Sequence, residues 1–279
     1  MRIERAAFFF TAIFLSLASA SLGQTSAQSS PVKAWKLPQG TAVVDNGPRT
    51  YRFTLDYDTA NTKGEVVFRQ QVAGEYTRGL PGGEVMWKNV TVADAAGPAG
   101  SLSTPQKRTF MEGFHYPKSA DTMKSEFFKG FPDTAVVERN LVWDTHMIEM
   151  FGQNYFDQLK LNEPFSNMSS EKINMPNVGT FDLHEAVLEW IGFSQRNGQE
   201  CALIQYEAFF NPLEIVNGGM TLKGRSDFWG EIWVSVATKQ IEYATLREVV
   251  VGEMKLPGQD TTQVVNVFRS GTLEPVSAK

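Results

Sequence analysis

Residues 186–210 read AVLEWIGFSQRNGQECALIQYEAFF, two largely apolar runs on either side of a short polar stretch. The centre of that stretch is Asn197-Gly198. A type I′ turn requires positive φ at both central residues, and Asn-Gly is the dipeptide that meets this requirement best. We therefore predict two antiparallel strands, Ala186–Gln195 and Cys201–Phe210, joined by a tight turn.

Other stretches of the chain have the two-residue period of a strand with one buried face. Tyr51, Phe53, Leu55 and Tyr57 alternate with polar or charged residues. Segments rich in Gly, Pro and polar residues separate the further runs. Additional strands are therefore predicted over Glu65–Thr77, Glu84–Val92, Asp227–Val236, Ile241–Gly252 and Thr262–Gly271.

Helical spacing occurs in one central block. Apolar residues recur there at close to three or four positions, namely Val137, Leu141, Ile148, Phe151, Tyr155 and Leu159. We predict one or two helices between about Thr122 and Leu161, with breaks at Pro132 and Gly152. A helix is also the alternative to a strand over Asp182–Trp190, whereas Asn162–Gly179 is expected to be irregular.

Strands in hairpins with one helical block predict the α+β class, an antiparallel β meander that forms a curved sheet or half-barrel, with helices packed on one face. The predicted organisation is a signal peptide over 1–20, an extended N-terminal arm over 21–48 and a single β-rich domain over 49–279. The arm is expected to be extended because Pro31–Pro48 is rich in Pro and Gly.

The N-terminus has the pattern of a secretory signal. Arg2 and Arg5 precede an apolar run over Ala6–Leu17, and the small residues Ala18-Ser19-Ala20 fit a cleavage site. A membrane anchor is the alternative, but the run reaches only about 18 Å as a helix, less than a bilayer core. We expect a secreted or periplasmic protein with no transmembrane segment after cleavage.

Composition excludes several classes of function. The formal net charge of −5 disfavours nucleic acid as a partner, and a single cysteine excludes a disulfide framework. We expect Cys201 to be a buried, inert thiol, because it lies in an apolar run.

The sequence has no nucleophile elbow, phosphate-binding loop, dinucleotide fingerprint or Cys-x-x-Cys pair, so no cofactor is predicted. His184-Glu185 resembles the start of a zinc-protease helix, but Leu188 occupies the place of its second histidine.

One cluster offers ligands for a divalent metal or an acid/base pair: Asp144, His146 and Glu149. On a helix, however, Asp144 and His146 face different directions. We therefore predict no metal site, and interpret these residues as polar groups of a solvated face or as a single hydrogen-bonded histidine. Asp182, His184 and Glu185 form a second such cluster with the same interpretation.

Large aromatic and methionine side chains are concentrated between Phe127 and Phe156. Such side chains can line a cavity for a lipid or small molecule, or they can form core. For the cavity interpretation, the predicted ligand-binding residues are Trp143, Met147, Phe151 and Tyr155 from this block, with Trp229 and Trp233 from one face of a predicted strand.

The stretch Gly230-Glu231-Ile232-Trp233-Val234, the turn at Thr238-Lys239 and the returning strand Ile241–Glu248 resemble the strand pairs of periplasmic lipoprotein-carrier (LolA-like) half-barrels. The resemblance implies a curved sheet closed by helices over a hydrophobic cavity, without catalysis. Those carriers open with a helix, whereas Pro31–Pro48 cannot form one.

The sequence therefore favours an exported, non-enzymatic protein that binds a hydrophobic small molecule or lipid in a cavity between sheet and helices. One alternative is an exported interaction or structural module with an envelope protein as its partner. A second alternative is a metal-assisted hydrolase that uses Asp144, His146 and Glu149.

Overall fold

A computed structural model describes residues 35–40, 42–96, 100–118, 125–166, 171–175 and 178–276. These residues belong to one unit, Trp35–Lys279. The predicted signal peptide and the first part of the predicted arm lie outside the described residues. None of the helices in the described ranges has the length and apolar character needed to span a bilayer.

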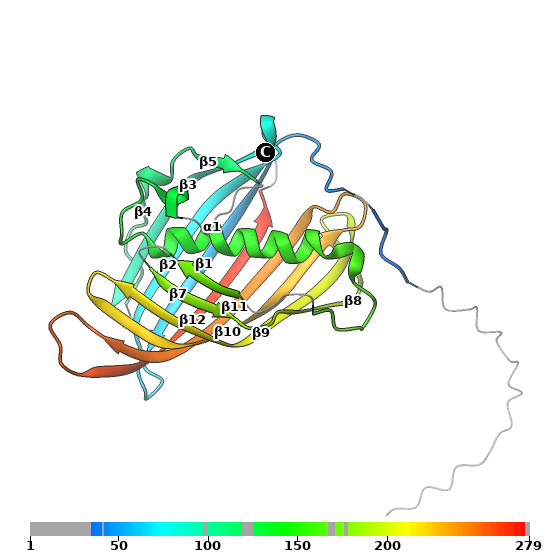
Figure 1. Ribbon diagram of the computed structural model, residues 1–279. Helices are drawn as coiled ribbons and strands as arrows, with labels where there is room; N and C mark the ends of the chain where they lie inside the picture. The colour runs from blue at the N-terminus through cyan, green and yellow to red at the C-terminus, as the bar shows by residue number, and fades with distance from the viewer. Residues whose placement is uncertain are drawn as a thin grey trace, which may run out of the picture. The chain divides into compact units, whose positions relative to one another are not determined.

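Two antiparallel meanders share one curved sheet (Figure 1). The first contains β1 (Arg49–Ala60), β2 (Val66–Arg78) and β3 (Glu84–Ala96), and the second contains β9 (Gln199–Asn217), β10 (Met220–Ser235), β11 (Ile241–Lys255) and β12 (Thr262–Pro275). They are joined because the first long strand pairs with the last, with Tyr51 opposite Pro275 and Ala60 opposite Asn266. The predicted antiparallel strands are confirmed, and the pairing of β1 with β12 is a feature that no local pattern indicated.

Short strands extend both edges of the sheet. They are β4 (Gln106–Lys107), β5 (Phe114–Pro117), β6 (Glu171–Met175), β7 (Gly179–Leu183) and β8 (Val187–Arg196). β4 and β5 pair with β3, while β8 and β7 pair with successive parts of β9. β6 pairs with β7 and lies within the stretch predicted to be irregular, so that prediction was wrong for Glu171–Met175.

The turn at Asn197-Gly198 is confirmed. Both residues have positive φ, 51° and 73° respectively, and Arg196 pairs with Gln199 across the turn. The alternative helix over Asp182–Trp190 does not form, because this stretch contains the end of β7 and the start of β8.

The central block contains one α-helix among the described residues, α1 (Val136–Glu149), which continues as a π-helical turn over Met150–Asn154. The helix begins after Pro132, which confirms that break, whereas Gly152 lies inside the π-helical turn that continues the helix to Asn154, so the predicted break at Gly152 was wrong. A Cβ on Gly152 would lie 3.0 Å from Cγ2 of Ile232, so glycine permits close packing against β10. Short 3-10 turns occupy Pro81–Gly83, Thr109–Met111, Ser125–Phe128 and Phe156–Gln158.

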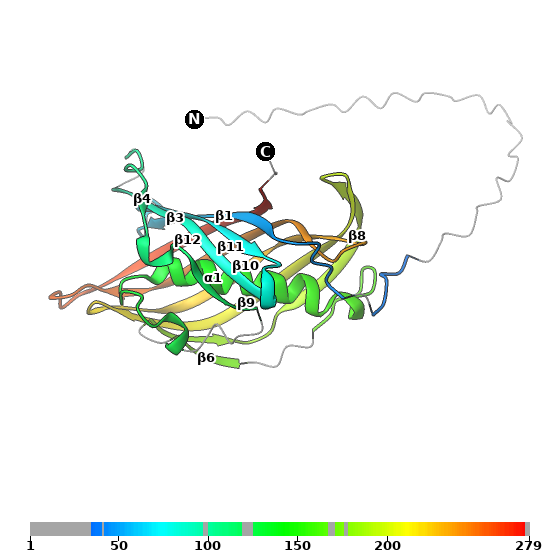
Figure 2. The same cartoon turned by 90° about the horizontal axis from the view of Figure 1, so that it is seen from above.

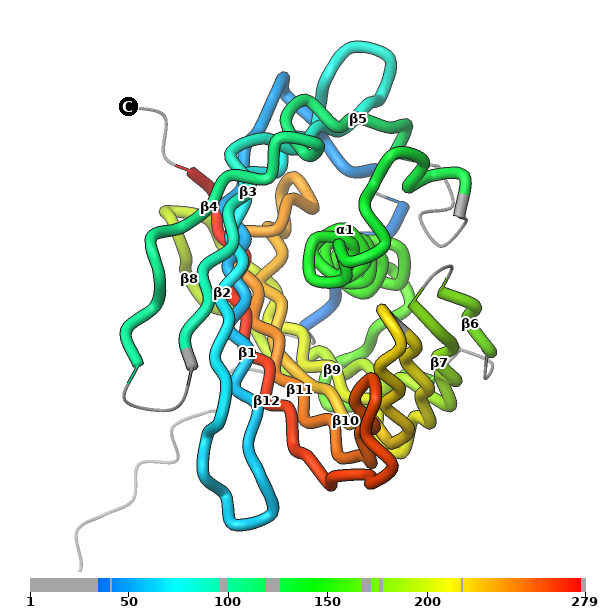
Figure 3. The backbone as a smooth tube through the Cα atoms, turned by 90° about the vertical axis from the view of Figure 1, so that its left-hand side faces the viewer, coloured from blue at the N-terminus to red at the C-terminus, as the bar shows by residue number. Residues whose placement is uncertain are grey.

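Helix α1 crosses the concave side of the sheet (Figures 1 and 3). Seen along its axis, it lies between the long strands and the β6–β7 hairpin, and the view from above shows the same order (Figures 2 and 3). Leu141, Val142 and Ile148 are fully buried on the helix, in the main core. The α+β class therefore holds, with an open curved sheet and few helices.

Two ion pairs hold the ends of α1. Glu138 is 2.7 Å from Nε of Arg108 at its start, and Glu149 is 2.7 Å from Nη1 of Arg78 at its end. Both carboxylates are buried. Because burying a carboxylate is costly without a partner, these pairs fix where the helix lies on the sheet.

The described part of the N-terminal arm, residues 35–40 and 42–48, has no helix. Leu37 is buried in the core, and the Val44 backbone N–H donates to the Thr238 carbonyl at 2.9 Å. Asp45 accepts a hydrogen bond from Arg78, the arginine that also holds the end of α1.

Candidate functional site

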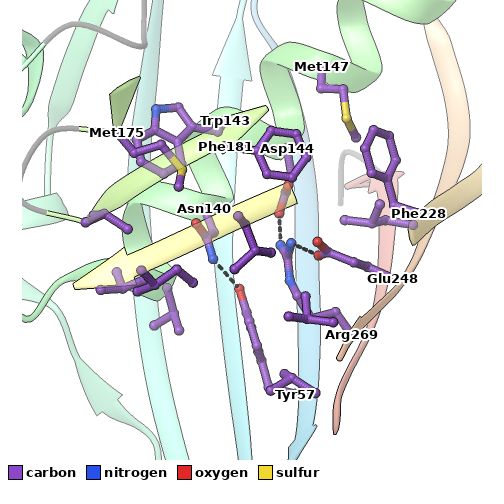
Figure 4. Close-up of a pocket in the computed structure, with 18 of the residues that line it drawn as sticks. Tyr57, Asn140, Trp143, Asp144, Met147, Met175, Phe181, Phe228, Glu248 and Arg269 are labelled. Atoms are coloured by element: carbon purple, nitrogen blue, oxygen red, sulfur yellow. Dashed lines mark hydrogen bonds and ion pairs between the residues drawn. The ribbon is translucent and has the colours of Figure 1, made fainter. Parts of the chain in front are cut away.

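A cavity of about 440 Å³ lies between α1 and the concave face of the sheet (Figure 4). Its lining includes Phe151, Phe228 and Leu246 of the main core. It also includes Leu213 and Val250, which belong to a separate small apolar cluster contributed by β9, β10, β11 and β12. The cavity therefore borders both apolar clusters.

Most of the lining is apolar. From α1 and the turn after it come Val136, Val137, Trp143, Met147, Met150 and Phe151, and from the β6–β7 hairpin come Ile173, Met175, Val178, Phe181 and Leu183. The spacing of the helical residues is that of one helix face. Figure 4 shows Trp143, Met147, Met175, Phe181 and Phe228 around the space.

A polar wall is contributed by three neighbouring strands. Tyr57 on β1 lies directly opposite Arg269 on β12, and Arg269 lies directly opposite Glu248 on β11. Direct partners across an antiparallel ladder point to the same face, and all three residues line the cavity. In Figure 4, the Arg269 guanidinium lies between the carboxylates of Asp144, from α1, and Glu248, and it is ion-paired to both.

Further contacts fix this wall. The Ser226 hydroxyl donates to Glu248 Oε1 at 2.5 Å. The Arg269 guanidinium lies 5.0 Å from the centre of the Tyr57 ring, within cation–π range. Nδ2 of Asn140 donates to the Tyr57 oxygen at 3.3 Å. The side chains of the wall therefore hold one another in place.

Burial sets the direction of the pKa shift for Asp144 and Tyr57, whereas neighbouring charges set it for Arg269. Burial raises the pKa of Asp144 to about 6, against the opposing effect of the Arg269 charge. Burial also raises the pKa of Tyr57 to about 12, so its hydroxyl stays protonated at neutral pH. For Arg269, burial acts to lower the pKa, but the charges of Asp144 and Glu248 raise it further, and the guanidinium stays cationic.

The structure brings together three of the six residues predicted to bind a ligand: Trp143, Met147 and Phe151 line the cavity. Tyr155 lies outside the lining and packs against Phe165, with ring centres 5.5 Å apart. Binding by these residues stays a prediction.

Trp229 and Trp233 point to the opposite face of the sheet. Their neighbours on β10, Phe228 and Ile232, are among the buried residues of that strand. Trp229 is 39% exposed and lies beside Phe209, and the guanidinium of Arg196 lies over the Trp233 ring.

The candidate metal cluster is divided between two arginines. Asp144 is ion-paired to Arg269 and Glu149 to Arg78, while His146 lines the cavity. Within the described ranges, no group of three or more His, Cys, Asp or Glu side chains is placed to hold a metal ion. Cys201 is buried, and burial raises the pKa of its thiol to about 11, which fits an inert cysteine.

Sequence reasoning missed Tyr57, Glu248 and Arg269 as site residues. A signal for two of them was present in the alternation of the last strands. Glu248 and Arg269 occupy inward positions between apolar neighbours such as Leu246, Val250 and Val267. A charged residue in an inward register is rarely buried without a partner, so each one indicates a polar site.

No family model matches this chain, and a search of curated proteins found no match. Two solved structures are similar over 84% of it. One is lipovitellin, in a study of its lipid–protein interactions, at 11% identity and a TM-score of 0.38; this chain spans only 26% of that one. The other is a DUF1329 family protein from Desulfovibrio piger, at 8% identity and a TM-score of 0.14, with 88% of that chain covered. At these TM-scores neither neighbour identifies a function.

Proposed function

We propose that this protein is exported and binds an apolar or amphipathic, lipid-like ligand in the cavity between α1 and the sheet. The observation that carries the proposal is a cavity of about 440 Å³ with a mainly apolar lining. Small-molecule pockets typically measure about 300–1,000 Å³ and combine apolar walls with a few polar groups. The wall formed by Tyr57, Asp144, Glu248 and Arg269 supplies such polar groups.

Packing energetics support a ligand in this space. Protein interiors are close-packed, and apolar voids destabilise the fold because their lining atoms lack contact partners. Met147, with a flexible apolar side chain, and Phe228, with a large one, both line the cavity. An apolar chain between them would restore those contacts and bury its own surface from water.

Uptake of Nile red, an uncharged dye that fluoresces in apolar surroundings, tests the proposal. We expect saturable uptake by the wild-type protein. Met147→Trp adds bulk to the cavity side of α1 and should weaken uptake about tenfold or more, equivalent to about 1.4 kcal/mol. Met147→Leu keeps the volume and should leave uptake nearly unchanged. Absence of saturable uptake, or equal uptake by all three proteins, contradicts the proposal.

A protein-interaction role is the second candidate, and exposed aromatic residues favour it. Phe209, Phe210 and Trp229 are 40%, 63% and 39% exposed, and Trp229 lies on the face of β10 that α1 does not cover. Aromatic residues are enriched where proteins dock. If this role holds, Trp229→Ala abolishes capture of an envelope protein while Nile red uptake is unchanged.

A further inference from the structure

The polar wall of the cavity leaves two hydrogen-bond donors without acceptors. Tyr57 receives a hydrogen bond from Asn140, but its own O–H has no acceptor among the described residues. Nε of Arg269 is buried and also has no partner in that part of the chain. Buried donors are normally paired, and leaving them unpaired costs free energy. The Nε of Arg269 has almost no accessible surface, so the O–H of Tyr57, which lines the cavity, is the donor that matches a ligand acceptor.

The charge of the wall disfavours an anionic ligand. Asp144 and Glu248 share the single guanidinium of Arg269, so the cluster has a net negative charge when both carboxylates are ionised. A carboxylate or phosphate placed here would be a further negative charge without its own cation. Like charges at a buried site repel strongly because water does not screen them.

A cationic head is disfavoured for a different reason. An alkylammonium group has only donors and no acceptor. It would place further N–H groups beside the O–H of Tyr57 and the Nε–H of Arg269, which would stay unpaired. Both carboxylate oxygens of Glu248 already accept, one from Arg269 and one from Ser226, and Oδ2 of Asp144 accepts from Arg269.

We infer that the ligand of this cavity has an uncharged head with a carbonyl acceptor, as in an acyl ester, which accepts a hydrogen bond from Tyr57. This inference rests on the proposed function. The acyl chain then contacts Met147, Met175, Phe181 and Phe228 across the cavity.

A competition experiment tests the inference. Protein at pH 8 is mixed with equal amounts of methyl oleate, oleate, oleylamine and octadecene, separated from free ligand by gel filtration, and the bound molecules are counted by mass spectrometry. We expect methyl oleate to be retained about tenfold or more over oleate and oleylamine. Tyr57→Phe keeps the ring beneath Arg269 but removes the donor, and should lower ester retention relative to octadecene about fivefold, the value of one hydrogen bond.

The matched control is Tyr51→Phe. Tyr51 is buried on the same strand, and its hydroxyl donates to Gln240 outside the cavity lining, so its loss should leave the ratio of ester to octadecene unchanged. Preferential retention of oleate or oleylamine overturns the inference, as does an unchanged ratio in Tyr57→Phe, while the proposed function stands. Retention of none of the four molecules contradicts the proposed function itself.

Discussion

Asp144 connects the helix to the polar wall of the cavity. Its carboxylate is ion-paired to Arg269, yet burial still raises its pKa to about 6. A raised pKa means that the folded protein holds this proton more tightly than the unfolded chain. Ionisation of Asp144 therefore opposes folding, and the cavity wall contains a carboxylate that is retained at a cost in stability.

This cost predicts a pH dependence. The Asp144 carboxyl ionises near pH 4 in the unfolded chain and near pH 6 in the folded protein. The protonated carboxyl therefore adds to the free energy of unfolding below pH 4, and this contribution is lost as the pH rises to about 6. We expect the free energy of unfolding of the wild type, relative to Asp144→Asn, to fall across this window and to level off above it. Denaturant titrations from pH 3.5 to 7.5 measure the difference, and parallel profiles would contradict the assignment.

Some residues of the cavity lining could be predicted from the sequence and others could not. The cavity side of α1 could be predicted because Trp143, Met147 and Phe151 follow helical spacing within one segment. Tyr57 and Arg269 could not be brought together, because they lie at opposite ends of the chain and become neighbours only through the pairing of β1 with β12. Local periodicity gives the face of each strand but not its partner.

At the scale of elements, α1 is held by ion pairs as well as by apolar contacts. Glu138, Asp144 and Glu149 are each paired with an arginine from a different part of the sheet or its loops. The sequence suggested a solvated polar face for Asp144 and Glu149. Both carboxylates are instead buried, because the sheet curves around the helix and leaves it little solvent contact.

The anchor at the end of α1 can be tested with Arg78→Met. Arg78 is fully buried and contacts both Glu149 and Asp45, so its replacement leaves a buried carboxylate without a cation. We expect a loss of about 3–5 kcal/mol in the free energy of unfolding. Arg52→Met is the control, because its ion pair with Glu75 is exposed and is worth at most about 1 kcal/mol. Equal losses in the two variants would refute the anchor.

The β8–β9 turn gives a second prediction at this scale. Gly198 has a φ of 73°, a conformation that a β-branched residue resists. Gly198→Val should therefore destabilise the protein by about 1 kcal/mol or more in thermal or denaturant unfolding. Gln195→Val, at an exposed position of β8 with extended backbone, should have little effect because valine suits a strand. A Gly198→Val protein as stable as the wild type would argue against the type I′ turn.

For the whole molecule, the strands were predictable but their order was not. Alternation identified β1, β2, β3 and β9 to β12, and the Asn197-Gly198 turn paired β8 with β9. The sheet order depends on β1 pairing with β12, a contact between the first and the last long strand. That contact also forms the polar wall, which explains why the fold class could be derived from sequence while half of the site could not.

Export is the other prediction for the whole molecule. The two arginines, the apolar run and the small residues at 18 and 20 predict cleavage after Ala20. Expression of the full chain in a secreting host, followed by N-terminal sequencing of the product, should give a start at Ser21. A product that begins at Met1 would contradict export, whereas a start at Gln28 would move the cleavage site and leave export intact.

The most direct test of the ligand cavity is a crystal structure of the protein grown with the methyl ester of a fatty acid brominated along its chain. Bromine scatters anomalously, so its position can be located independently of the protein density. We predict a bromine peak between Met147 and Phe228, with the ester carbonyl toward Tyr57. A cavity filled by repacked side chains, or bromine bound only beside Trp229 on the opposite face of the sheet, would contradict the account.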